Sequence, residues 1–121
     1  KMKNERQDLS ERLLGFAAIV IKLTAALNKT APGRHVASQL MRSATSSGAN
    51  YEEACGAESK ADFIHKMQLV LKELKESLYW LKLIRKSALM SDERVEPVLR
   101  ETHELVNIIA KSVITAKNRS L

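Results

Sequence analysis

Apolar side chains recur at alternating steps of four and three residues in four separate segments of the chain. That spacing places the side chains of each segment on one stripe of an α-helix. The first helix is expected to start near Asp8 or Ser10, either of which can cap it, and to end at residues 28–33, where Pro32 and Gly33 break the pattern. Its stripe consists of Leu9, Leu13, Phe16, Val20, Leu23 and Leu27.

A second helix is expected from about Arg34 to about Cys55, and much of its inward face is made of small side chains. The stripe consists of Val36, Leu40, Ser43, Ser47, Asn50 and Ala54. Residues around Gly48 have low intrinsic helix propensity, so packing against other helices must hold this segment helical. The small side chains have two interpretations: they let a neighbouring backbone approach closely, or they form a polar binding groove.

The third helix is expected to run from a cap at Ser59 to about Ala88, with Gly56 ending the helix before it. Its stripe extends over three heptads. The stripe consists of Phe63, Met67, Val70, Leu74, Ser77, Leu81 and Ile84.

The fourth helix is expected to follow a cap at Ser91 and to fray near Lys117. Its stripe consists of Val95, Leu99, Thr102, Val106, Ile109 and Val113. Pro97 lacks an amide hydrogen, so the regular part of this helix is expected to begin only at Glu96.

The fold class follows from these four stripes and the short connections between them. Short connections make sequential helices antiparallel neighbours. The length of 121 residues fits one domain, residues 1–121, and 4 Gly and 2 Pro are too few for a turn-rich β fold. We therefore expect an all-α protein with an antiparallel up-down-up-down four-helix bundle.

The third helix carries more apolar surface than one bundle core requires. On one broad flank of this helix, an aromatic side chain and acidic side chains lie on the same face, an arrangement typical of protein–protein contacts. The predicted subunit interface consists of Leu69, Glu73, Glu76, Trp80 and Leu83. An exposed patch of this kind is rare in monomers, which favours a homo-oligomer. The alternative is that the first and fourth helices of the same chain cover both flanks.

The formal net charge is +6, which permits attraction to phosphate backbones but equally describes an ordinary solvated surface. Residues 60–86 hold seven basic and three acidic side chains. The candidate nucleic-acid-binding residues of this segment are Lys72, Lys75, Lys82 and Lys86. The nucleic-acid signal is weak at this point, because no aromatic side chains are expected between the lysines to stack on bases.

Motifs for catalysis and for cofactor or metal binding are not recognisable in the sequence. The four glycines are too far apart for a phosphate-binding loop, and no nucleophile elbow occurs. His35, His65 and His103 fall on three different predicted helices without metal-ligand spacing. The single cysteine, Cys55, excludes an intrachain disulfide and favours the cytoplasm, and no membrane-spanning stretch is found. We expect a protein that is not an enzyme and that has no cofactor.

Residues 38–54, 59–66 and 72–81 resemble the four-helix-bundle proteins encoded by intervening sequences of bacterial 23S ribosomal RNA genes. The Gln, Arg, Asn and Glu positions of these segments fall in matching order, while residues 51–54, after Asn50, depart from the shorter aliphatic, acid and glycine pattern of many members. The resemblance implies an antiparallel four-helix bundle, commonly a homopentamer, without established enzymatic activity. The chain also resembles, more distantly, the accessory protein of diversity-generating retroelements, a basic pentameric bundle that associates with a reverse transcriptase and nucleic acid.

Two functions of different classes therefore remain. The first is a homo-oligomeric, preferably pentameric, scaffold that binds RNA or a nucleic-acid enzyme through its basic outer faces. The second is a protein-binding adaptor without a nucleic-acid role, which uses the Trp80 flank.

Overall fold

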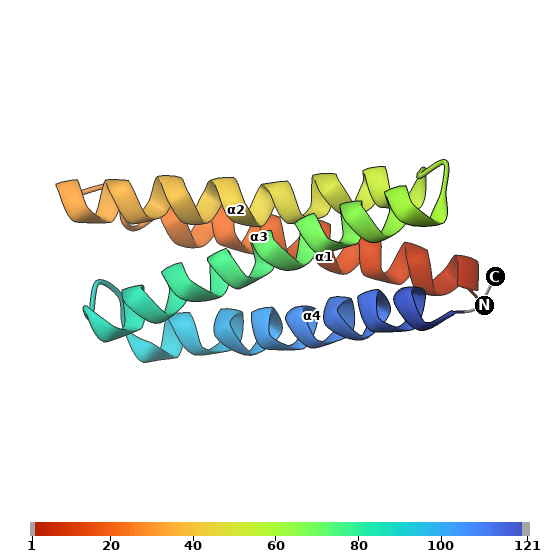
Figure 1. The fold of residues 1–121 in the computed structure, drawn as a ribbon. Helices are drawn as coiled ribbons and strands as arrows, with labels where there is room; N and C mark the ends of the chain where they lie inside the picture. The colour runs from red at the N-terminus through yellow and green to blue at the C-terminus, as the bar shows by residue number, and fades with distance from the viewer. Residues whose placement is uncertain (1, 120–121) are drawn as a thin grey trace.

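Four long helices joined by short connections make up nearly all of the chain. The computed structural model describes residues 2–119, and the side chains of residues 8–119. The helices are α1 (Met2–Ala25), α2 (Ala31–Cys55), α3 (Lys60–Lys86) and α4 (Asp92–Asn118). They run alternately in opposite directions and pack side by side as a bundle (Figure 1). The predicted all-α, antiparallel four-helix bundle is confirmed, while residues 1, 120 and 121 of the predicted domain lie outside the described part.

The core of the bundle consists largely of the four predicted stripes. Leu13, Leu40, Leu74 and Ile109 are each 0% exposed, and each such burial contributes about 1.5–3 kcal/mol relative to exposure. The stripe residues that are only half-buried are Leu9, Asn50, Phe63 and Val106. Tyr51, next to Asn50, and Leu105, next to Val106, are buried in place of these two stripe residues. A straight helix drifts relative to a seven-residue repeat, which explains these one-residue displacements.

The small inward face of α2 is a packing surface. Ser43 and Ser47 are each 0% exposed, so the alternative of an open polar groove on this face is wrong. The Ser43 and Ser77 hydroxyl oxygens are 2.8 Å apart and hydrogen-bonded, which joins α2 to α3 inside the core. The prediction that small side chains allow close approach of a neighbouring helix is confirmed.

Two helix starts lie earlier than predicted. The first helix begins at Met2, so the expectation of a cap at Asp8 or Ser10 is wrong; residues 2–7 are mostly good helix formers and extend the helix. The second helix begins at Ala31 because the Thr30 hydroxyl accepts a hydrogen bond from the Gly33 amide at 3.0 Å. The proline at the start of this helix, Pro32, stands in the first turn, where it is well tolerated.

The boundaries around the last connection also differ from the prediction. The third helix ends at Lys86, and Ala88 adopts a left-handed backbone conformation with φ of 56°. The fourth helix begins at Asp92 rather than Glu96, with Pro97 inside it. The hydrogen bond lost at Pro97 is the one to the Glu93 carbonyl, and because Glu93 is exposed, water can replace it.

Candidate nucleic-acid interface

The outermost face of α3 carries a row of exposed side chains. The row recurs at steps of three and four residues, as one helix face requires. Its members are His65, Gln68, Lys72, Lys75, Tyr79, Lys82 and Lys86, all exposed. The buried Val70, Leu74 and Leu81 lie on the opposite side of the helix. We call Lys72, Lys75, Tyr79, Lys82 and Lys86 the basic row.

Tyr79 stands within the basic row, between Lys75 and Lys82. It is 59% exposed, and its ring packs against that of Trp80 with the two centroids 5.0 Å apart at an interplanar angle of 76°. The expectation that no aromatic side chain lies between the lysines is therefore wrong. The contact with Trp80 orients the tyrosine ring while leaving most of it accessible to a stacking base.

The lysines of the basic row form no salt bridge among the residues whose side chains the structure describes, although the charge of Lys72 helps to lower the pKa of Glu76, four residues further on. Lys66, by contrast, forms a salt bridge of 2.7 Å with Glu53 of α2 and serves to join these two helices. From Lys72 to Lys86 the row extends over about 21 Å at the usual helical rise. Four positive charges without salt bridges along that length form a linear surface for a phosphate backbone.

Two acids of α3, Glu73 and Glu76, lie on the side that faces α2, where Arg42 binds them. Its guanidinium forms a salt bridge of 3.4 Å with Glu73 and a second salt bridge with Glu76. The Trp80 indole nitrogen donates a hydrogen bond of 3.1 Å to the same Glu76 carboxylate. The hydrogen bond from Arg42, helped by that from Trp80, lowers the pKa of Glu76. Two of the acids predicted at a subunit interface are thus engaged within one chain.

The apolar members of the predicted interface are also partly covered by the chain itself. Leu69, Trp80 and Leu83 are half-buried, so the premise that they form an exposed patch in one chain is wrong. The His35 ring of α2 meets the Trp80 ring at a centroid distance of 5.8 Å and an angle of 82°. The contacts come from α2, whereas the alternative to an oligomer considered from the sequence was cover by α1 and α4. A subunit contact on this flank stays a prediction.

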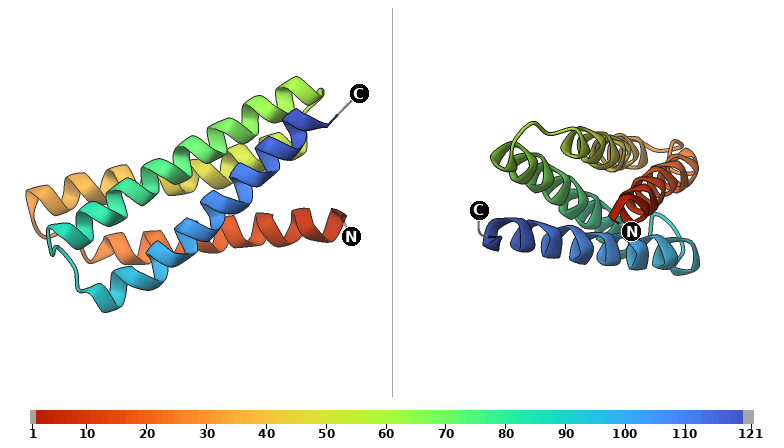
Figure 2. Two further views of the ribbon diagram at one scale, coloured as in Figure 1. Left: turned by 60° about the horizontal axis from the view of Figure 1, so that its bottom comes forward. Right: turned by 90° about the vertical axis from the view of Figure 1, so that its right-hand side faces the viewer.

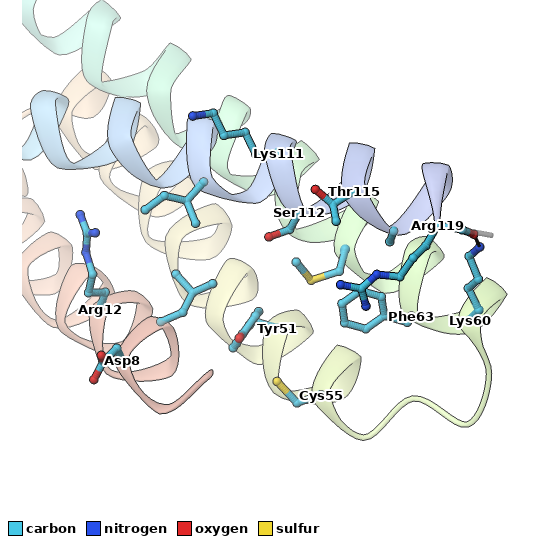
Figure 3. A pocket seen from close by; sticks show the side chains of 14 residues that line it. Asp8, Arg12, Tyr51, Cys55, Lys60, Phe63, Lys111, Ser112, Thr115 and Arg119 are labelled. Atoms are coloured by element: carbon cyan, nitrogen blue, oxygen red, sulfur yellow. Dashed lines mark hydrogen bonds between the residues drawn. The ribbon is translucent and has the colours of Figure 1, made fainter. Parts of the chain in front are cut away.

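At the end of the bundle that holds the two chain termini, α1 and α4 spread apart (Figure 2). The residues at this end line a pocket. Its volume is about 680 Å³, and all four helices contribute to its lining (Figure 3). Phe63 and Met67 supply apolar surface, while Lys111 of α4 and Arg119, just after α4, line it with positive charge. Arg12 of α1 also lines the pocket and forms a salt bridge of 2.6 Å with Glu101 of α4.

The described residues give no sign of a metal centre or a membrane span. No group of three or more His, Cys, Asp or Glu side chains within them is placed to hold a metal ion. His35 packs on Trp80, and His65 and His103 are exposed and lie on different helices. Cys55 is half-buried against the core. Within the same part of the chain, no helix combines the length and apolarity needed to cross a bilayer.

Comparisons with known proteins agree with this architecture. A family model described as "23S rRNA-intervening sequence protein" matches residues 5–111. A crystal structure of a protein of unknown function from the S23 ribosomal protein family of Bacteroides thetaiotaomicron is similar, with a TM-score of 0.82 and 31% sequence identity. The match covers 87% of this chain and 97% of that one. A search of curated proteins found no match. The chain therefore belongs to the family of 23S rRNA-intervening sequence proteins.

Proposed function

We propose that this protein is a non-enzymatic, homo-oligomeric scaffold of the cytoplasm that binds RNA through the outer face of α3. The observation that supports this function is the basic row, in which four exposed lysines without salt bridges flank an exposed tyrosine. Lysines attract the phosphates of any nucleic acid, and an exposed aromatic ring stacks on bases that are not already paired. The combination favours unpaired RNA, such as a loop or a single strand, over a regular duplex.

Assembly of several copies should raise the affinity for RNA. One basic row offers few phosphate contacts, so a single chain binds weakly, whereas several rows held in one particle act together on one RNA molecule. The family resemblance favours five copies. A pentamer of chains of 13.5 kDa has a mass of about 67.5 kDa, which sedimentation equilibrium measures directly.

The test of RNA binding compares two variants with the same loss of charge. Lys75→Gln/Lys82→Gln removes two lysines of the basic row, and Lys29→Gln/Lys111→Gln removes two exposed lysines elsewhere. Fluorescence anisotropy with a short labelled single-stranded RNA measures the affinity. We expect the first variant to bind about tenfold more weakly at low salt and the control to stay much closer to wild type.

Two results would contradict the proposed function. Equal losses in both variants would mean that the RNA responds to net charge and not to the outer face of α3. No binding by the wild-type protein, together with a protein partner that survives nuclease treatment in a pull-down, would support the adaptor function instead.

A further inference from the structure

The pocket at the end of the bundle that holds the chain termini has the size of a small-molecule site. Its volume of about 680 Å³ falls within the range of about 300–1,000 Å³ that such sites occupy. Residues of α1 and α4, the most loosely packed pair of adjacent helices, line it together with residues of α2 and α3. The salt bridge of 2.6 Å between Arg12 and Glu101 joins α1 to α4 beside it. The pocket is therefore a concave space that a ligand can enter, not a flat helix face.

The lining of the pocket is mainly apolar. Its apolar side chains come from α1, α3 and α4 and are buried or half-buried: Leu9, Phe63, Met67, Ile108 and Ala116. A hydrocarbon that packs against these side chains is removed from water, which is favourable. A nucleic-acid base, which carries donors and acceptors along its edge, fits such a lining less well because these groups would lose their water without gaining enough partners.

Positive charge gathers at the edge of the same pocket. The described residues that line it include four cations and one acid, namely Arg12, Lys60, Lys111, Arg119 and Asp8. Arg12 is already bound to Glu101 and, at 2.9 Å, to Glu104. Lys111 and Arg119 are exposed and form no salt bridge with the side chains that the structure describes. Two cations at the edge are therefore available to an anion.

The backbone of Arg119 is fixed at the pocket by two hydrogen bonds. Its amide donates one of 3.1 Å to the Thr115 carbonyl, and its carbonyl accepts one from the Lys60 ammonium group. Figure 3 shows the Arg119 side chain extending back from the end of α4 toward Phe63. A guanidinium presents parallel N–H donors that match a carboxylate or a phosphate. Lys111, about two helical turns earlier, adds a second positive charge.

We propose that this pocket binds a free anionic amphiphile, a small molecule with a hydrocarbon body and a carboxylate or phosphate head. The hydrocarbon lies against Phe63, Met67 and Ile108, and Arg119 and Lys111 bind the head. The inference goes beyond RNA binding and does not depend on it, because no residue of the basic row is among the described residues that line the pocket.

Isothermal titration calorimetry with sodium decanoate and decyl phosphate, each below its micelle concentration, tests the site. The controls are 1-decanol, decyltrimethylammonium and sodium acetate, which lack the charge, reverse the charge and lack the hydrocarbon. We expect the anionic probes to bind, 1-decanol to bind about tenfold more weakly, and the other two not to bind detectably. The tighter of the two anionic probes identifies the head. Equal binding of 1-decanol and decanoate, or of acetate and decanoate, would overturn the inference.

A pair of variants with the same loss of charge locates the head. Lys111→Gln/Arg119→Gln removes the two cations of the pocket, and Lys29→Gln/Arg94→Gln removes two exposed cations at the opposite end of the bundle. All four residues are exposed, so both proteins should keep the helical circular dichroism of wild type. We expect the pocket variant to bind decanoate about tenfold more weakly and the control to bind it as wild type does. Equal weakening in both variants would contradict a head bound by Arg119 and Lys111.

The reactivity of Cys55 gives a second measurement of where the probe binds. Cys55 is the only cysteine of the chain and lines the pocket. Its alkylation by neutral iodoacetamide should slow as decanoate fills the pocket, while alkylation of free cysteine in the same solution stays constant. An alkylation rate that is unchanged when decanoate is bound would place the probe elsewhere and overturn the inference. A thiol that reacts only after unfolding in urea, even without a probe, would overturn it too, because the pocket would then be closed in the assembled protein.

Discussion

The guanidinium of Arg42 on α2 and the carboxylate of Glu76 on α3 form a salt bridge across 34 residues of sequence. The same carboxylate accepts a hydrogen bond of 3.1 Å from Trp80, the only tryptophan of the chain. Arg42, Glu76 and Trp80 thus tie the two helices together beside the basic row. The intrinsic fluorescence of Trp80 consequently reports on the α2–α3 contact.

The pH dependence of stability should follow this contact. The pKa of Glu76 is lowered from its ordinary value of 4.5. A carboxyl whose folded-state pKa is depressed contributes stability that is complete above its unfolded value and is lost as the pH falls through the folded value. We expect urea unfolding, followed by Trp80 fluorescence, to show a smaller loss of stability between pH 6 and pH 3, roughly the carboxyl titration range, for Glu76→Gln than for wild type. Identical losses would show that Arg42 does not hold the carboxylate.

Two glycines should respond in opposite ways to alanine. A Cβ atom at Gly33 would lie 2.1 Å from the Leu27 carbonyl oxygen, so Gly33→Ala should cost about 2 kcal/mol of unfolding free energy through a clash with the turn before α2. Gly15→Ala meets nothing within 4 Å and should stabilise the folded single chain by about 0.5–1 kcal/mol. Thermal unfolding followed by circular dichroism measures both. A neutral Gly33→Ala would disprove the close approach at this turn.

Ala88 is a site where glycine should stabilise the protein. Its φ of 56° is unfavourable for a side chain with a Cβ atom, and glycine removes that cost. We expect Ala88→Gly to raise the unfolding free energy by about 0.5 kcal/mol, after allowance for the greater freedom of glycine in the unfolded chain. Ala49→Gly, at an exposed position inside α2, is the control and should destabilise by about 1 kcal/mol. Destabilisation by both would argue against the left-handed conformation.

Tyr79 should contribute to RNA affinity through its ring. Stacking on a base is worth about 1–3 kcal/mol, so Tyr79→Ala should weaken binding of single-stranded RNA by a factor of about 5 to about 150. Tyr79→Phe keeps the ring and should bind nearly as well as wild type. Because Tyr79 is 59% exposed, neither change should alter the melting temperature much. Equal affinities of the alanine and phenylalanine variants in a fluorescence titration would remove stacking from the account.

The helical architecture could be predicted because each helix carries its own periodic stripe. Leu13, Leu40 and Leu74 are buried where the four-and-three spacing places them. The helix starts were less predictable, because Asp8 has the chemistry of a cap but preceding helix formers carry α1 past it. Pro97 likewise appeared to delay α4, yet its lost hydrogen bond falls at an exposed carbonyl near the helix start.

The composition of the basic row and the cover of the Trp80 flank could not be predicted, because both depend on which residues come together in the folded chain. Tyr79 lies four positions after Lys75 and three positions before Lys82, so it shares a face with them only when the helix is formed. The Trp80 flank is contacted by Arg42 and His35 of another helix, and the spacing of residues within α3 does not reveal those contacts. The spacing of residues within one helix does not show which residues of a distant helix will contact it.

The salt dependence of RNA affinity tests the proposed function most directly. Each phosphate neutralised by a lysine adds about 0.7 to the magnitude of the slope of log affinity against log salt for a single strand. We predict a steep slope for the wild-type protein, which becomes shallower by about 1.4 in Lys75→Gln/Lys82→Gln and changes little in Lys29→Gln/Lys111→Gln. A slope that is flat, or that is the same in the wild-type protein and the variant of the basic row, would contradict RNA binding by the outer face of α3.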